Sequence, residues 1–153
     1  MEMNIRFADE KDMDILVSMW KDFMGGDFAD KSNLKMSEIN INRWRSLAKM
    51  SIQQRMIKVA DTNGEVVGFI LLNYGVQPFE TIQKSALILE LYVVPRHRRK
   101  GYGRRLLHDG LEYVKSQGCT LIALNVLSDN IHAIRFYERE GFEPVFHTMK
   151  KDL

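Results

Sequence analysis

The chain has 153 residues, of which 45% are hydrophobic and 27% are charged, and its formal net charge at pH 7 is +2. This length suits one α/β domain over residues 1–153, and no window is apolar enough to cross a bilayer. The small net charge predicts no nucleic-acid partner, and the charged N-terminus has no signal-peptide core. A single cysteine, Cys119, excludes an intrachain disulfide and favours a reducing, cytoplasmic location.

The order of predicted elements favours one mixed sheet flanked by helices. Alternating or short apolar runs predict strands at residues 4–7, 56–60, 66–74, 84–94 and 120–127. Helical spacing of apolar residues predicts helices from the Asp9 cap to Gly25-Gly26, and over 38–50, 103–117 and 130–140. The continuously apolar run at 120–127 is typical of a buried central strand, and one or two last strands are expected from Phe142 onward.

Paired glycines lie among basic residues where the fourth strand meets the next helix. The segment reads Pro95-Arg96-His97-Arg98-Arg99-Lys100-Gly101-Tyr102-Gly103-Arg104. N–H groups at a helix start have no partner within the helix and favour an anion, and glycines let the backbone approach it closely. A dinucleotide fingerprint fails because position 106 is Leu106, and the P-loop spacing is also missing. The segment predicts a phosphate-binding loop; solvated surface charge would explain the basic residues but not the paired glycines.

A second motif begins at Asn130 and ends at Phe142. Ala133 and Tyr137 are one helical turn apart and share a face. Taken alone, Asn130 is a helix cap and Tyr137 a core aromatic. Together with Arg98-x-x-Gly101-x-Gly103, however, the pattern N-x-x-A-x-x-F-Y-x-x-x-G-F resembles the GNAT acetyltransferases, and the resemblance extends over nearly the whole chain.

This resemblance implies a GNAT-like single domain with a mixed, mostly antiparallel sheet that uses acetyl-CoA as co-substrate. It implies direct acetyl transfer to a primary amine in a ternary complex, with no metal, and it makes a homodimer plausible. Tyr137 would donate a proton to the leaving thiolate, and a backbone N–H near Val93 would stabilise the oxyanion. The expected cofactor-binding residues are Leu91, Tyr92, Val93, Arg98, Arg99, Lys100, Gly101, Tyr102, Gly103, Arg104, Asn130, Ala133 and Tyr137.

The general base is missing from the positions where the family often places it. Those positions hold Leu87, Leu89 and Asn125, none of which ionises. Glu90 is the nearest carboxylate; simple alternation turns it to the wrong face, but a β-bulge would re-aim it. Our hypothesis is that a water chain ending on Glu90 removes the proton. The alternative is a catalytically silent acyl-CoA-binding regulatory module.

The acceptor is expected between the N-terminal helices and the strand ends. Aromatic and acidic residues occur together there: Trp20, Asp22, Phe23, Asp27 and Phe28. Such a set suits a cationic amine, although the same pattern fits core aromatics beside solvated carboxylates. A polyamine, an aminoglycoside-like amine, an amino acid and a peptide N-terminus all stay open.

Overall fold

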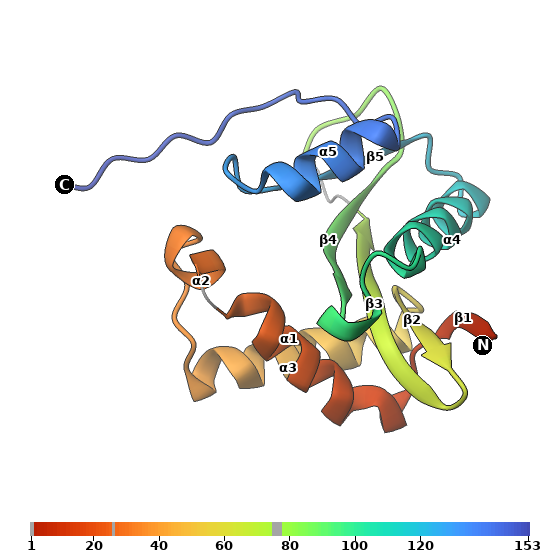
Figure 1. Ribbon diagram of the computed structural model, residues 1–153. Coiled ribbons are helices and arrows are strands. Elements are labelled where there is room, and N and C mark those ends of the chain that lie inside the picture. The colour runs from red at the N-terminus through yellow and green to blue at the C-terminus, as the bar shows by residue number, and fades with distance from the viewer. Residues whose placement is uncertain (1, 26, 75–77) are drawn as a thin grey trace.

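A five-stranded sheet lies at the centre of the computed structural model, which describes residues 2–25, 27–74 and 78–153 (Figure 1). Its strands, in the order β1-β2-β3-β4-β5, are β1 (Met3–Phe7), β2 (Ile57–Thr62), β3 (Glu65–Tyr74), β4 (Ser85–Val93) and β5 (Leu121–Leu124). The first four strands pair antiparallel, and β5 pairs parallel with β4. The predicted mixed, mostly antiparallel sheet is confirmed.

Helices cover both faces of this sheet. They are α1 (Met13–Met24), α2 (Asp27–Lys31), α3 (Glu38–Gln53), α4 (Tyr102–Ser116) and α5 (Ile131–Arg139), with 3-10 turns η1 (Glu10–Asp12) and η2 (Pro95–His97). Figure 1 shows α1 and α3 on one side of the sheet and α4 on the other. The short α2 is not predicted by the sequence pattern. None of the helices in the described part of the chain is long and apolar enough to span a membrane.

Two apolar clusters hold these layers together. On the α1/α3 side, Trp20 and Trp44 pack with Phe69 of β3. On the α4 side, Leu106 and Leu107 pack with strand residues that alternate to the opposite face. The central strands β2 and β3 are therefore buried on both faces, which leaves the strand ends and the β5 side of the sheet for a site.

Strand β4 packs tightly against Gly68 of β3. A Cβ atom there would lie 2.6 Å from the Tyr92 carbonyl oxygen, a backbone atom that cannot move aside. We expect Gly68→Ala to lower the free energy of unfolding by about 2 kcal/mol, measured by urea denaturation. Gly103→Ala is the control, because its added methyl would meet Val93 Cγ2 at 3.9 Å, an ordinary contact. Equal stabilities of the two variants would contradict the close approach.

Two predictions about the C-terminal part of the chain are wrong. The run at 120–127 is not a buried central strand: β5 covers only Leu121–Leu124, lies at the sheet edge, and leaves Leu121 exposed. Beyond Phe142, residues 143–153 form no strand and run away from the body (Figure 1). A strand needs a partner ladder, and in the described residues none lies beside this segment; Pro144 also lacks an N–H to donate.

Candidate functional site

The strands β4 and β5 separate halfway along β4. Their pairing runs from Ser85 to Ile88, whereas β4 continues to Val93. The Val94 N–H donates to the Val67 carbonyl of β3 at 2.9 Å. Because successive residues alternate in the direction of their backbone groups, the N–H and C=O of Leu91 and Val93 point away from β3, into the gap. This open strand edge suits an extended ligand that carries amide groups.

The predicted phosphate loop lies directly after this edge. Gly101 caps α4 in a left-handed conformation (φ 85°), and Arg99 also has a positive φ of 60°. The first bond of the helix runs from the Arg105 N–H to the Gly101 carbonyl at 3.0 Å, so the N–H groups of Tyr102, Gly103 and Arg104 remain without a helical partner. A Cβ atom on Gly101 would meet no atom of the described residues within 4 Å, so this part of the structure leaves the space beside the loop open. The loop fits a diphosphate.

The side chains of the loop differ in what they contribute. Arg98 Nε donates to the Val93 carbonyl at 2.7 Å, and its guanidinium lies 5.4 Å from the centre of the Tyr92 ring. Arg98 therefore fixes the loop to the end of β4. Arg104 Nε lies 3.0 Å from Glu140 Oε1, which links α4 to the end of α5. Arg99 and Lys100 are exposed and stay available for phosphate charge.

The buried rings of Tyr102 and His97 pack beneath the backbone of the loop, on its protein side. Tyr102 is buried, and the Thr62 hydroxyl donates to its oxygen at 3.5 Å, so Tyr102 offers the loop its backbone rather than its side chain. His97 packs edge-on against that ring, with centroids 5.4 Å apart. Burial, followed by the charges of Lys100 and Arg96, lowers the pKa of His97. Its Nδ1 is buried without a hydrogen-bond partner in the described structure. In the sequence this residue reads only as part of a basic run.

A β-bulge places Glu90. Glu90 pairs with Leu71 and Ile88 with Leu72, so Leu89 is the extra residue on β4. Simple alternation puts Ile88 and Glu90 on one face, but the bulge separates them: Ile88 packs on the α4 side, and Glu90 faces α3. The Trp44 Nε1–H donates to Glu90 Oε1 at 2.7 Å.

The environment of Glu90 alters its acidity. Glu90 is only 9% exposed. It lies beside the indole rings of Trp20 and Trp44, which stack with their centroids 5.4 Å apart. Burial raises the pKa of Glu90 to about 7, and the hydrogen bond from Trp44 partly opposes this rise. A carboxyl group of this kind exchanges its proton near neutral pH, which is the property a general base requires.

The second motif forms α5. Asn130 Oδ1 accepts from the Ala133 N–H at 3.2 Å, so its side chain caps the helix. Tyr137 lies between the rings of Phe136 and Phe142, at centroid distances of 5.1 and 5.5 Å. Burial raises the pKa of Tyr137 to about 12, so the phenol keeps its proton at neutral pH and remains a donor.

Of the residues predicted to bind the acetyl acceptor, some lie in the core and others at the surface. Trp20 is buried, and Phe23 packs on Phe28 at 4.9 Å and edge-on against Tyr92 at 6.4 Å. The Tyr92 hydroxyl donates to the exposed carboxylate of Asp22. Burial and this carboxylate raise the pKa of Tyr92 to about 12. The side chain of Asp27 lies outside the described part of the structure.

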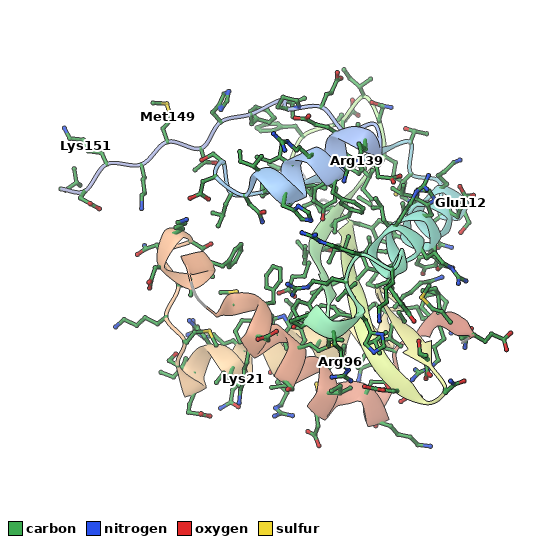
Figure 2. All side chains as sticks on the ribbon, viewed as in Figure 1. Lys21, Arg96, Glu112, Arg139, Met149 and Lys151 are labelled. Carbon is green, nitrogen blue, oxygen red and sulfur yellow. The ribbon has the colours of Figure 1, made fainter. Side chains whose placement is uncertain are left out.

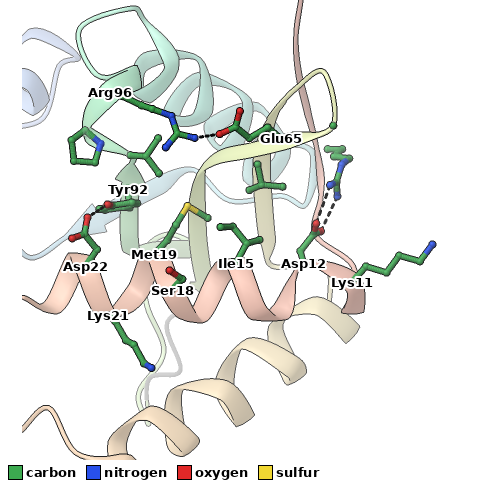
Figure 3. A pocket seen from close by; sticks show the side chains of 15 residues that line it. Lys11, Asp12, Ile15, Ser18, Met19, Lys21, Asp22, Glu65, Tyr92 and Arg96 are labelled. Carbon is green, nitrogen blue, oxygen red and sulfur yellow. Dashed lines mark hydrogen bonds and ion pairs between the residues drawn. The ribbon is translucent and has the colours of Figure 1, made fainter.

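Asp22 and Tyr92 face each other at one end of an open cavity of about 860 Å³ (Figure 3). Helix α1, the β2–β3 turn and η2 form its walls, and an ion pair between Arg96 and Glu65 crosses from η2 to that turn. Both acidic and basic side chains line the cavity. Because its walls come from α1 and the end of β4, the cavity adjoins the strand end on the α1 side, whereas the phosphate loop lies at the start of α4.

Comparisons with known proteins agree with this geometry. The chain matches the acetyltransferase (GNAT) family over residues 16–142. It is 28% identical to the uncharacterized N-acetyltransferase YhfO of Bacillus subtilis over 141 residues, which cover 92% of this chain and 90% of that protein.

Two solved structures share the fold. The structure of AAC(6')-Iy in complex with the bisubstrate analogue CoA-S-monomethyl-acetylneamine has a TM-score of 0.75 at 14% identity, covering 100% of this chain and 99% of that one. The PaiA N-acetyltransferase of Thermoplasma acidophilum, in complex with coenzyme A, has a TM-score of 0.70 at 23% identity, covering 94% and 91%. The chain therefore belongs to the acetyltransferase (GNAT) family of acetyl-CoA-dependent N-acetyltransferases, as its two motifs predict, with acetyl-CoA as co-substrate.

Proposed function

We propose that this chain, as one domain over residues 1–153, transfers an acetyl group from acetyl-CoA to a primary amine of a small molecule or a peptide N-terminus. The amine attacks directly in a ternary complex. One observation carries the proposal: beyond its pairing with β5, β4 turns the backbone groups of Leu91 and the N–H of Val93 toward the gap, and the same segment holds the buried Glu90 carboxyl. The strand edge proposed to bind the co-substrate and a titratable group thus lie within four residues of each other.

The residues around the gap fit the co-substrate. The backbone groups of Leu91 and the N–H of Val93 would hold its amide-bearing arm, and the α4 N-terminus with Arg99 and Lys100 would hold its phosphates. Acetyl-CoA supplies an activated acyl group whose leaving thiolate has a conjugate-acid pKa near that of cysteine, about 8.5. The Val93 N–H, which points into the gap, would stabilise developing negative charge on oxygen.

Glu90 would take the proton that the attacking amine must lose. With a pKa of about 7, the carboxyl group is partly ionised at neutral pH. A water molecule between the amine and Glu90 would let this nearly buried carboxylate act without direct contact with the substrate.

Tyr137 would donate its proton to the leaving sulfur. We expect Tyr137→Phe to lower kcat by about 30-fold and to change the KM for acetyl-CoA little, because the donor acts only as the thiolate forms. Steady-state thiol release measures both constants. Tyr113→Phe, which removes a hydroxyl from α4 instead, is the control. A Tyr137→Phe enzyme with normal kcat would show that the ring serves only packing.

Trp44 would act as a positioning residue for Glu90. Its N–H lowers the pKa of Glu90, so Trp44→Phe should raise that pKa further and move the acidic limb of the kcat/KM profile to higher pH. A pH series of thiol-release rates measures the limb. A variant that loses activity equally at every pH would contradict this role and indicate a packing defect.

The carboxylates favour a cationic acceptor. Asp22 is exposed beside Tyr92 at the mouth of the cavity, where a positive group on the substrate would find an acceptor. The amine classes left open by the sequence, including a polyamine and an aminoglycoside-like amine, all carry this charge.

The test is thiol release from acetyl-CoA against a panel of monoamines, polyamines, aminoglycosides, amino acids and peptides, with mass detection of the acetylated product. The proposal expects a mono-acetylated product from one amine class. CoA binding without turnover on any member would instead support the catalytically silent regulatory module.

Two further expectations stay proposals. The buried free thiol of Cys119 favours a reducing, cytoplasmic location. A homodimer is proposed as the assembly.

A further inference from the structure

Glu140 joins the end of α5 to two basic side chains of α4. Its Oε2 lies 2.5 Å from His108 Nε2, and its Oε1 lies 3.0 Å from Arg104 Nε. Arg104 and His108 are four residues apart, so they share one face of α4. Figure 2, which labels Arg139 of α5 and Glu112 of α4, shows the two helices side by side. We call Arg104, His108 and Glu140 the α4–α5 clamp.

Two residues of the clamp occupy positions that their own helices disfavour. Glu140 caps the C-terminal end of α5, where the helix dipole disfavours a carboxylate, and Arg104 lies in the first turn of α4, where the dipole disfavours a cation. The hydrogen bond with His108 and the charge of Arg104 lower the pKa of Glu140, so the carboxylate is ionised at neutral pH. Pairing between the helices therefore accounts for both charges, whereas helix formation does not.

The clamp connects the two parts of the proposed co-substrate site. Arg104 directly follows Gly103 of the phosphate loop. At the other end, the Glu140 N–H donates to the Tyr137 carbonyl at 3.0 Å, so a single turn of backbone joins these residues. The pairing of β4 with β5 ends at Ile88, and α4 follows β4 along the chain as α5 follows β5. The clamp therefore ties together the two helices that follow the diverging strands.

We infer that Glu140 is a positioning residue that fixes, through the clamp, the distance between the phosphate loop and the Tyr137 hydroxyl. The inference rests on the proposed function, in which the loop holds the phosphates of the co-substrate and Tyr137 protonates its sulfur. With the phosphates held at α4, a displacement of α5 by about 1 Å moves the donor away from the sulfur and slows the reaction. Arg104 then serves the clamp and not the phosphates, so CoA affinity should not depend on Glu140.

The inference is tested with one matched pair of variants in two backgrounds. Glu140→Ala removes both contacts of the clamp, and Glu138→Ala, on the exposed surface of the same helix, is the control. Each is made in the wild-type chain and in the Tyr137→Phe variant. Thiol release measures kcat, calorimetry measures the dissociation constant of CoA, and hydrogen exchange of the α5 amides measures the clamp without any need for activity.

We expect Glu140→Ala to lower kcat about tenfold, to change the CoA dissociation constant less than about twofold, and to speed exchange of the α5 amides about tenfold. In the Tyr137→Phe background it should lower kcat no further, because both changes remove the same proton donation. Equal losses of kcat in the two backgrounds, unchanged α5 exchange, or equal effects of Glu138→Ala overturn the inference. A wild-type chain that releases no thiol contradicts the proposed function instead, and α5 exchange then still decides whether the clamp holds the helix.

Discussion

Replacing Glu90 by Gln is expected to lower kcat/KM for the amine about 100-fold above pH 7 and to abolish the acidic limb of the pH profile. Glutamine keeps the shape of the side chain and can still accept the Trp44 N–H, but it cannot take a proton. Thiol-release rates between about pH 5 and pH 9 measure the effect. Glu112→Gln, on the exposed surface of α4, is the matched control. A Glu90→Gln enzyme with the wild-type profile would exclude Glu90 as the base.

The same variant has a separate signature in stability. The folded-state pKa of Glu90 is about 7, above its ordinary value of 4.5, so the folded protein binds the extra proton between these values. Wild-type stability must therefore fall as pH rises through this window and level off above it. The Glu90→Gln variant lacks this pH dependence, so its free energy of unfolding should rise relative to that of the wild type by on the order of 3 kcal/mol across the window. Urea unfolding at the low-pH and high-pH ends of this window measures the difference. The same pH dependence of stability in the variant and the wild type would contradict the raised pKa.

Replacing Gly101 by Ala is expected to raise the dissociation constant of CoA about 30-fold. The left-handed conformation at φ 85° aims the first N–H groups of α4 at the open space above the loop. A side chain strains that conformation, which lowers stability, and it places a methyl group where a phosphate would approach, which costs about 2 kcal/mol of binding free energy. Isothermal titration calorimetry with CoA measures the constant.

Gly118→Ala is the control for this substitution. Gly118 has a similar φ of 91° but lies after the opposite end of α4, where the added methyl would meet the Lys84 side chain at 3.8 Å or more, an ordinary contact. It should lower stability about as much as Gly101→Ala and leave CoA affinity unchanged. Equal losses of affinity in both variants would mean that backbone strain, and not the cradle, causes the effect.

Local chemistry explains why much of the fold was predictable. The Asn63-Gly64 pair, a sequence typical of two-residue hairpin turns, has two positive φ values, 53° and 84°, and forms the turn between β2 and β3. The left-handed turn at Gly101 that opens α4 was predictable for the same reason, because a glycine directly before a helix favours a positive φ. Asn130 also takes the capping position that its residue type favours.

The features that the sequence left open or missed depend on contacts between distant segments. A β-bulge was considered as a way to re-aim Glu90, but its position at Leu89 arises from the pairing of β4 with β3, and no residue type in β4 specifies it. The apolar run at 120–127 indicates burial on both sides, but it does not say which strand lies beside it, and in this structure β5 is an edge. His97 was read as one charge among many, because only the ring of Tyr102 and the surrounding backbone make it a buried support of the loop.

Calorimetric titration of the wild-type chain with CoA and acetyl-CoA is the decisive experiment, since acetyl transfer requires that the phosphate loop and the open edge of β4 bind this co-substrate. We expect saturable binding of both at one site per chain, with an affinity that falls as salt screens the basic loop. Absence of binding at every concentration would contradict it, whatever activity the chain then showed toward amines.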